Sequence, residues 1–162
     1  MHGTADSAGG SKAAAARAKA ALAAGDHAGA FAELRTAVRP EDDFTEQARI
    51  ARAFAKIDVD ALGLRPLKVA VLAGSTVDHL ADVLRFWLAA SGFAAEIYLA
   101  PYDTVAQTVL DPASGLYAFA PQVVWLFSTH RDAGVAVEPG ASAAEVETAV
   151  DAAVAERTAL WQ

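Results

Sequence analysis

Three short polar segments contain the residues of this sequence that could do chemistry. Each follows an apolar run that is typical of a strand, and the segments are Gly74-Ser75-Thr76, Pro101-Tyr102-Asp103 and residues 128–132 (STHRD). In an open parallel sheet, ligands bind beyond the carboxyl ends of the strands, so we expect the three segments to converge. Their residue types would allow nucleophilic chemistry with a hydroxyl nucleophile, an imidazole base and backbone amides that hold an anion.

Ser75 is the candidate nucleophile, because it lies at a predicted strand-to-helix turn near the positive end of the helix dipole. A serine nucleophile needs a base that is itself oriented by a third group. His130 is the best-placed candidate base, and Asp103 or Asp132 could orient it. His79, four residues after Ser75 in the same predicted helix, is a second candidate, although its position is more typical of a surface histidine.

The same three segments predict a substrate-binding site. Backbone amides at Gly74 and Thr76 could hold a phosphate or an oxyanion, and Tyr102 and Thr129 would line the same hollow. The turn lacks the glycine pattern of a P-loop or a dinucleotide-binding motif. We predict no metal site in this chain.

Purely structural roles are open alternatives for these residues. Ser75 fits the N-cap of the helix that follows, with Asp78 three residues on. Asp103 fits the N-cap of a short helix, and His130 fits an ordinary loop histidine. The two interpretations differ in where the side chains point, which the sequence leaves open.

The elements that would position these segments alternate between strands and helices. The predicted strands are 67–73, 95–100 and 121–128, and the helices that follow them are 76–91, 104–111 and 142–160. This order predicts an α/β fold with a small parallel sheet of about three strands, flanking helices and right-handed crossovers. With a strand order of 2-1-3, Ser75 lies between the other two tips.

The remaining residues predict helices. Alanine-rich residues 11–24 and the apolar spacing in 27–38 and 44–57 indicate a helical N-terminal segment. We therefore divide the chain into a disordered tail (1–10), a helical segment (11–62) and an α/β domain (63–162). Ser142 and Glu145 form a capping box for the last helix, in which we expect the valines to face inward: Val146, Val150 and Val154.

Composition and charge exclude several classes of protein. The 162 residues carry a net charge of −7, and hydrophobic residues make up 54%. An acidic chain is not suited to gripping nucleic acid. The absence of cysteine excludes disulfides, thiolate catalysis and cysteine-ligated metals. No apolar run is long enough for a membrane span, and the first residues lack a signal-peptide core, so we expect a cytoplasmic protein with no membrane partner.

Three stretches of the chain resemble the N-terminal region of FkbH-like proteins, which belong to the haloacid-dehalogenase (HAD) superfamily. They are DDFTEQARIARAFAKIDVDALGLRPLKVAVLAGSTVDHL (42–80), AAEIYLAPYDTVAQTVLDPASGLYAF (94–119) and PQVVWLFSTHRD (121–132). The resemblance implies a flavodoxin- or SGNH-like fold. With about three strands, the predicted sheet would be an incomplete version of that fold. The resemblance also implies a role in loading a glyceryl unit from 1,3-bisphosphoglycerate onto an acyl carrier protein, with loss of phosphate, for polyketide and tetronate biosynthesis.

The sequence departs from the family at two motifs. The Asp-x-Asp-x-Thr motif of the phosphatase half, which uses Mg²⁺, is absent, and so is the late Asp-x-x-His of SGNH enzymes. Ser75 does match the position of the SGNH serine, as Gly-Ser-Thr. The resemblance therefore implies that a HAD-like catalytic half, in the same or a separate chain, would supply the Mg²⁺, and that the carrier protein would bring its phosphopantetheine.

The leading hypothesis is a domain that recognises the carrier protein or positions its glyceryl group. Carrier proteins are usually acidic, so a local basic patch must do this work, and the candidates are Arg35, Arg39, Arg49 and Arg52. One alternative is an SGNH-like esterase or acyltransferase that uses Ser75. Another is a structural module that forms a homo-oligomer through the helical segment.

Overall fold

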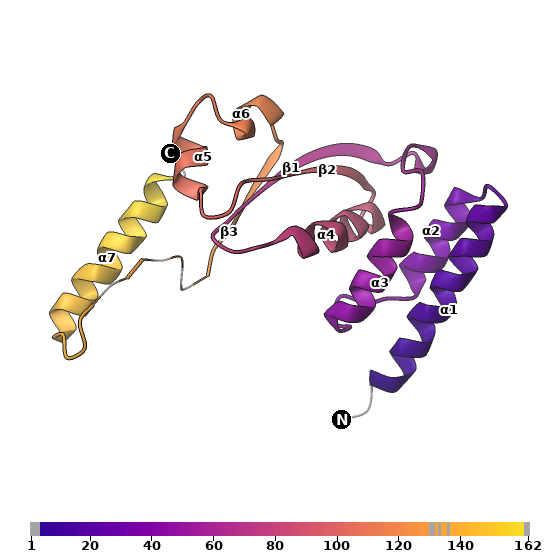
Figure 1. Cartoon of the computed structure of the whole chain (residues 1–162), viewed down its shortest axis with the longest axis horizontal. Helices are drawn as coiled ribbons and strands as arrows, with labels where there is room; N and C mark the ends of the chain where they lie inside the picture. Colours follow the sequence, from indigo (N-terminus) through magenta and orange to yellow (C-terminus); the bar gives the residue numbers. More distant parts are fainter. Residues whose placement is uncertain (1–3, 130–131, 133, 136, 161–162) are drawn as a thin grey trace. The chain divides into compact units, whose positions relative to one another are not determined.

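The computed structural model describes residues 4–129, 132, 134–135 and 137–160 (Figure 1). The fold is α/β, as predicted. The helical elements before the sheet are α1 (Thr4–Ala23), α2 (His27–Thr36), α3 (Phe44–Phe54) and the 3₁₀ turn η1 (Asp60–Leu62). The sheet and its helices follow in the order β1 (Arg65–Ala73), α4 (Asp78–Ala90), β2 (Phe93–Leu99), α5 (Val105–Leu110), α6 (Gly115–Phe119), β3 (Val123–Phe127) and α7 (Ala143–Ala159).

The sheet is parallel, as predicted, and its strand order is β2-β1-β3, which is the order under which Ser75 would lie between the other two tips. β1 and β3 pair in a register that runs from Val69 opposite Val123 to Ala73 opposite Phe127. The run from Val69 to Ala73 is buried because β1 is the central strand and is covered on both faces. The short aliphatic residues of β1 suit this position.

The chain contains two compact units. One comprises the residues up to Lys68 together with Val77–Ile97, and we call it the helical unit. The other comprises Val69–Thr76 and the chain from Tyr98 onward, and we call it the sheet unit. The unit boundaries cut through β1 and β2, so each unit combines residues that are distant in the sequence.

The helical unit has an aromatic core. The ring of Phe54 lies 5.6 Å from that of Phe31 and 5.8 Å from that of Phe86, measured between ring centroids. Leu34 and Ile50 are fully buried beside them. The buried residues recur at helical spacing in α2 and α3, so the predicted inward faces of these two helices are confirmed.

Acidic caps set the starts of α2 and α3. The Asp26 carboxylate accepts a hydrogen bond from the backbone N–H of Gly29 at 2.7 Å, and Asp43 accepts one from Glu46 at 3.1 Å. Each cap satisfies a backbone donor that has no partner within its helix, which is why the chain can leave a turn and begin a helix at these positions.

The sheet unit has a smaller core and an incompletely covered strand. Ala70, Leu72, Val105 and Leu116 are buried together. The edge strand β3 differs from β1, because Val123, Val124 and Trp125 are 38–46% exposed. The predicted third strand therefore exists, but its side chains are only partly covered within the described residues.

Two helical predictions need correction. α1 begins at Thr4 and not at residue 11, because extending an existing helix costs little once alanine-rich residues have nucleated it. The valines of α7 do not face inward: no residue of α7 is buried, although the predicted capping box of Ser142 and Glu145 is confirmed. No helix in the described part of the chain is long and apolar enough to cross a membrane.

Candidate functional site

The tips of β1 and β3 meet in the sheet unit through Asp132. The Asp132 carboxylate accepts hydrogen bonds from the backbone N–H of Thr129 at 2.5 Å and from the Thr129 hydroxyl at 2.9 Å. The backbone N–H of Asp132 donates to the Thr129 carbonyl at 3.0 Å. These bonds link Asp132 to Thr129, just after β3, and orient the Asp132 carboxylate.

Gly74 is required at the tip of β1 because of this carboxylate. A Cβ atom at Gly74 would overlap the Asp132 carboxylate. The reason is space and not backbone conformation, since the φ angle of Gly74 lies outside the left-handed region. The predicted convergence of the segments after β1 and β3 therefore has direct structural support at this glycine.

Ser75 lies beside Gly74 and is half-buried. The alternative prediction that Ser75 is the N-cap of α4 is wrong. Val77 occupies that position, and no side chain makes a capping hydrogen bond there. The helix begins two positions later than a capping serine would require. The Ser75 hydroxyl is therefore not used as a helix cap, and its role as a nucleophile stays a prediction.

The segment after β2 is more open. Tyr102 is 68% exposed, and Asp103 is exposed with a φ of +55°. Asp103 does not cap α5 as the structural alternative required. Thr104 is the N-cap, and its hydroxyl donates to the Pro101 carbonyl at 2.8 Å. Of the two aspartates considered for orienting a histidine, Asp132 is the one that the structure places against the β1 tip.

The structure describes one of the two histidines predicted as the base. His130 lies outside the described residues. His79 is exposed on α4, and its ring makes an edge contact with Phe44, with 5.4 Å between centroids. This contact lies within the helical unit, so His79 has the surface role that its position in the helix suggested.

A separate apolar hollow of about 790 Å³ lies in the sheet unit, beside α5, α6 and β3. Its lining includes Leu116, Tyr117, Pro121 and Val124, and no charged residue lines it. The lining runs along β3 from Pro121, just before the strand, to Leu126 near its end, and it includes none of the residues predicted for the anion site.

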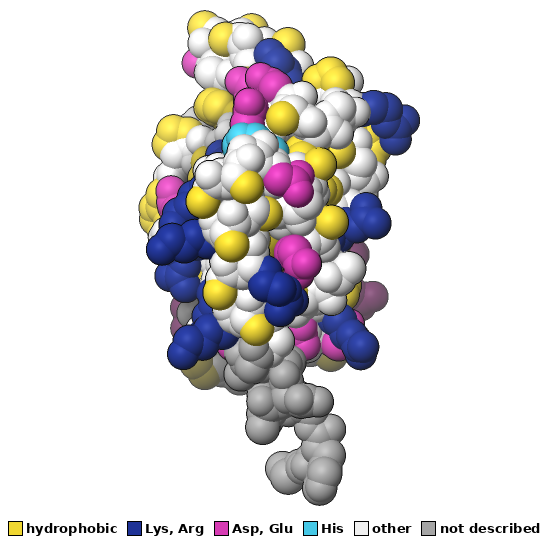
Figure 2. Space-filling model, turned by 90° about the vertical axis from the view of Figure 1, so that its right-hand side faces the viewer, with side chains coloured by type: hydrophobic (Ala, Val, Ile, Leu, Met, Phe, Trp, Pro, Cys, Tyr) yellow, Lys and Arg dark blue, Asp and Glu magenta, His cyan; other side chains and the backbone are white. Residues whose placement is uncertain are grey.

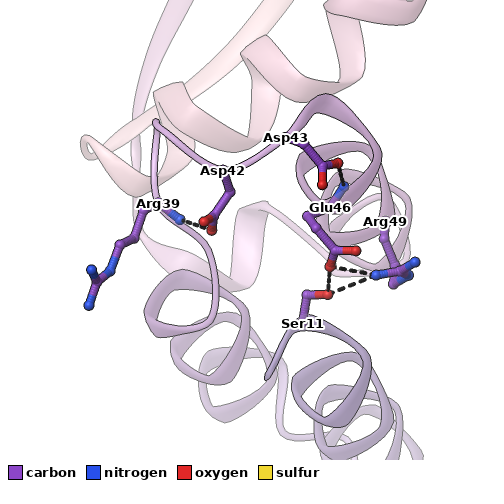
Figure 3. A network of polar contacts seen from close by, with 6 residues as sticks. All are labelled: Ser11, Arg39, Asp42, Asp43, Glu46 and Arg49. Atoms are coloured by element: carbon purple, nitrogen blue, oxygen red, sulfur yellow. Dashed lines mark hydrogen bonds and ion pairs between the residues drawn. The ribbon is translucent and has the colours of Figure 1, made fainter. Parts of the chain in front are cut away.

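The predicted basic residues in the helical unit fall into two groups. Arg49 is engaged inside the protein: its guanidinium donates to Glu46 at 2.5 Å and to the Ser11 hydroxyl at 2.9 Å (Figure 3). The hydrogen bonds from Ser11 and then from Arg49 lower the pKa of the Glu46 carboxyl below its ordinary value. Arg49 thus shares its charge with a buried carboxylate, while the Arg39 side chain points away from the network.

A groove between α1 and α3 is lined by Arg49 and Arg52 together with two lysines. Its volume is about 550 Å³. Each helix contributes residues at positions i, i+3, i+4 and i+7, which lie on one helical face. The groove lining comprises Ala15, Ala18, Lys19 and Leu22 from α1, and Arg49, Arg52, Ala53 and Lys56 from α3 and the turn after it.

The groove has an apolar floor and a basic rim. The floor is small and apolar because it consists mainly of alanines, whereas Lys19, Arg52 and Lys56 are exposed at the rim. Sequence reasoning missed both lysines. The spacing of Arg49, Arg52 and Lys56 could have indicated a basic stripe on α3, but Lys19 is brought beside them only by the packing of α1 on α3.

Arg35 and Arg39 do not line this groove, although both are exposed at or just after the end of α2. Figure 2 shows the side of the molecule that is on the right in Figure 1. Lysine and arginine side chains are spread over it, and several gather along its left margin. The structure therefore brings two of the four predicted arginines together and leaves the other two outside the groove.

No group of three or more histidine, aspartate and glutamate side chains that could hold a metal occurs in the part of the chain that the structure describes. These residues do not fit the Mg²⁺ that the FkbH-like resemblance implies.

Comparison with known proteins gives one partial similarity. The solved structure is the N-terminal part of the protein BF1531 from Bacteroides fragilis, which contains a phosphatase domain complexed with Mg. The match has 26% sequence identity and a TM-score of 0.48, and it covers 56% of this chain and 22% of that one. No family model matches this chain, and a search of curated proteins found no match.

Proposed function

We propose that this chain is the N-terminal, SGNH-like part of an FkbH-like glyceryl-loading system and that its helical unit recognises the acyl carrier protein. The observation that carries the proposal is the α1–α3 groove, in which a basic rim surrounds an apolar floor. The sequence resemblance over residues 42–80, 94–119 and 121–132 supplies the reaction and the partner.

The groove has the properties that an acidic amphipathic helix requires. Such a helix can place its apolar face on the alanine floor and its carboxylates against Lys19, Arg52 and Lys56. The chain as a whole has a net charge of −7, which disfavours an acidic partner at long range. The attraction must therefore act locally, within a Debye length of roughly 8 Å at physiological salt, so binding should weaken as salt increases.

In this proposal the sheet unit positions the group that the carrier delivers. The backbone amides of the Gly74–Thr76 turn, together with Tyr102 and Thr129, would hold the glyceryl end of the phosphopantetheine arm. A HAD-like half would bind Mg²⁺ and remove the phosphate. The residues of this chain would bind and orient, which agrees with the absence of the Asp-x-Asp-x-Thr motif from the sequence.

Binding of the whole chain to a carrier protein that bears phosphopantetheine tests the proposal. The double variant Arg52→Glu/Lys56→Glu reverses the rim, and Arg35→Glu/Arg39→Glu is a control with the same change in net charge outside the groove. Exposed charge pairs contribute about 0.2–1 kcal/mol each, and reversal also adds repulsion. We expect the rim variant to bind about tenfold or more weakly and the control to change much less.

Two results would contradict carrier recognition through the groove. One is that the unaltered chain shows no binding at any salt concentration. The other is that the control variant loses as much affinity as the rim variant, which would indicate a diffuse electrostatic attraction with no defined groove.

A second candidate function, an SGNH-like esterase or acyltransferase, rests on Ser75. Its hydroxyl does not cap α4, and Gly74 beside it lies against the Asp132 carboxylate. Hydrolysis of a p-nitrophenyl ester that disappears in Ser75→Ala would support this function. Inactivity of the unaltered chain toward both esters and acyl thioesters would remove it.

A further inference from the structure

Helix α7 exposes an apolar stripe that has no cover within the described residues of the sheet unit. Val146, Val150 and Val154 are spaced four residues apart, so they lie along one face, and they are 38%, 42% and 58% exposed. No residue of this helix is buried. A long helix gains little from propensity alone, so a stripe of this kind is expected to be covered by another surface.

The flanks of the stripe are acidic. Glu147 and Asp151 each follow a valine of the stripe, and therefore run along one side of it. Glu145 and Glu156 add two more carboxylates, while Arg157 in the last turn is the basic residue of the helix. The helix is thus acidic overall, with three exposed valines on one face.

The α1–α3 groove is complementary to this helix in both polarity and charge. The groove offers an alanine-rich floor for the valines and a rim of Lys19, Arg52 and Lys56 for the carboxylates. We infer that the α7 helix of a second copy of this chain binds in the α1–α3 groove. Its valines lie on the floor, and Glu147 and Asp151 face the basic rim.

This inference concerns self-association and does not need the carrier protein. One further consequence does rest on the proposed function: a groove that holds α7 cannot also hold a carrier helix. Self-association and carrier binding should then compete, and carrier protein should dissociate the self-associated chain.

Sedimentation velocity of the whole chain over a range of protein concentrations, at low and high salt, tests the inference. The groove variant is Arg52→Glu/Lys56→Glu, and the helix variant is Glu147→Lys/Asp151→Lys. All four positions are exposed, so the fold should tolerate the changes. Each variant alone should associate about tenfold or more weakly than the unaltered chain, because like charges would face each other.

The decisive experiment is sedimentation of a mixture of the groove variant and the helix variant. The reversed groove of one variant then meets the reversed helix of the other, and the remaining groove and helix are both unaltered. Every contact in the mixed species is attractive, so association should return to near that of the unaltered chain. A control variant, Glu41→Lys/Glu138→Lys, makes the same charge change as the helix variant at exposed positions outside the groove and α7, and should associate normally.

Several outcomes would overturn the inference. They are a chain that stays monomeric at every concentration and salt, variants that associate as well as the unaltered chain, and a mixture that fails to recover. The second outcome would point to another surface, such as the exposed face of β3. Carrier binding to the groove without self-association would overturn the α7 contact and leave the proposed function intact.

Discussion

Replacing Gly74 with alanine tests whether the tips of β1 and β3 form one structural site. The new Cβ would overlap the Asp132 carboxylate. The carboxylate would have to move, and it would then lose its hydrogen bonds from the N–H and the hydroxyl of Thr129. The link between Thr129 and Asp132 after β3 should weaken as a result.

The size of the effect follows from those two bonds. A hydrogen bond to a charged acceptor contributes about 1.5–3 kcal/mol when solvent is excluded. Thr129 is exposed and Asp132 only half-buried, so water can replace these hydrogen bonds in part and their net contribution is smaller. We expect about 1–2 kcal/mol for the two bonds together. Replacement of glycine by alanine alone would stabilise the chain by about 0.4–1 kcal/mol through the unfolded state.

A double-mutant cycle separates these contributions. Gly74→Ala should destabilise the unaltered chain but be neutral or slightly stabilising in an Asp132→Ala background, because the obstacle is then gone. The unfolded-state contribution cancels, which leaves a coupling free energy of about 1–2 kcal/mol. Urea unfolding monitored by circular dichroism provides the four free energies. Additive effects of the two substitutions would refute the contact between the tips.

Three further predictions concern the core, the buried carboxylate and the cap. Phe86→Ala should lower the free energy of unfolding by about 3–5 kcal/mol, because the fully buried ring packs on Phe54 and Trp87; a loss below about 1 kcal/mol in urea unfolding would contradict this core. The lowered pKa of Glu46 contributes stability that is present above its ordinary value of 4.5 and is lost as the pH falls through the folded pKa, so Glu46→Gln should flatten the acid side of the stability profile; an unchanged acid limb would argue against the Ser11 and Arg49 contacts. Ser75→Ala should change stability by less than about 0.5 kcal/mol, whereas loss of a real N-cap would cost about 1 kcal/mol in thermal unfolding.

Local rules predicted the sheet well because they act within short stretches. The aliphatic run of β1 needs burial on both faces, and only a central strand offers it. The capping box of Ser142 and Glu145 is likewise local and was found from spacing alone. The strand order was left open by the sequence, and the structure supplies it as β2-β1-β3.

Features that depend on distant contacts were missed. The sequence predicts no helix at the position of α6, where Ser114 and Gly115 favour turns. The helix is stabilised instead by tertiary bonds: the Ser114 hydroxyl donates to the Thr108 carbonyl at 2.7 Å, and the Tyr117 hydroxyl donates to the Val109 carbonyl at 2.6 Å. No local pattern encodes those partners.

The candidate sites show the same division. The strand tips could be predicted, since they follow from the strands being parallel, but the use of Ser75 as a cap could not be judged before the start of α4 was known. The valine spacing of α7 predicted an inward face, which is wrong, because periodicity does not reveal whether a surface lies against that face. The groove required α1 and α3 to pack together before Lys19 and Lys56 could be seen as neighbours.

The most direct test of the account is NMR titration of the isotope-labelled chain with a carrier protein that bears phosphopantetheine. Recognition through the groove predicts that the largest amide shift changes cluster in two stretches, 15–22 and 49–56, and that they diminish as salt increases. Amide shift changes confined to other surfaces would contradict it. The absence of any shift change at the highest carrier concentration tested would contradict it as well.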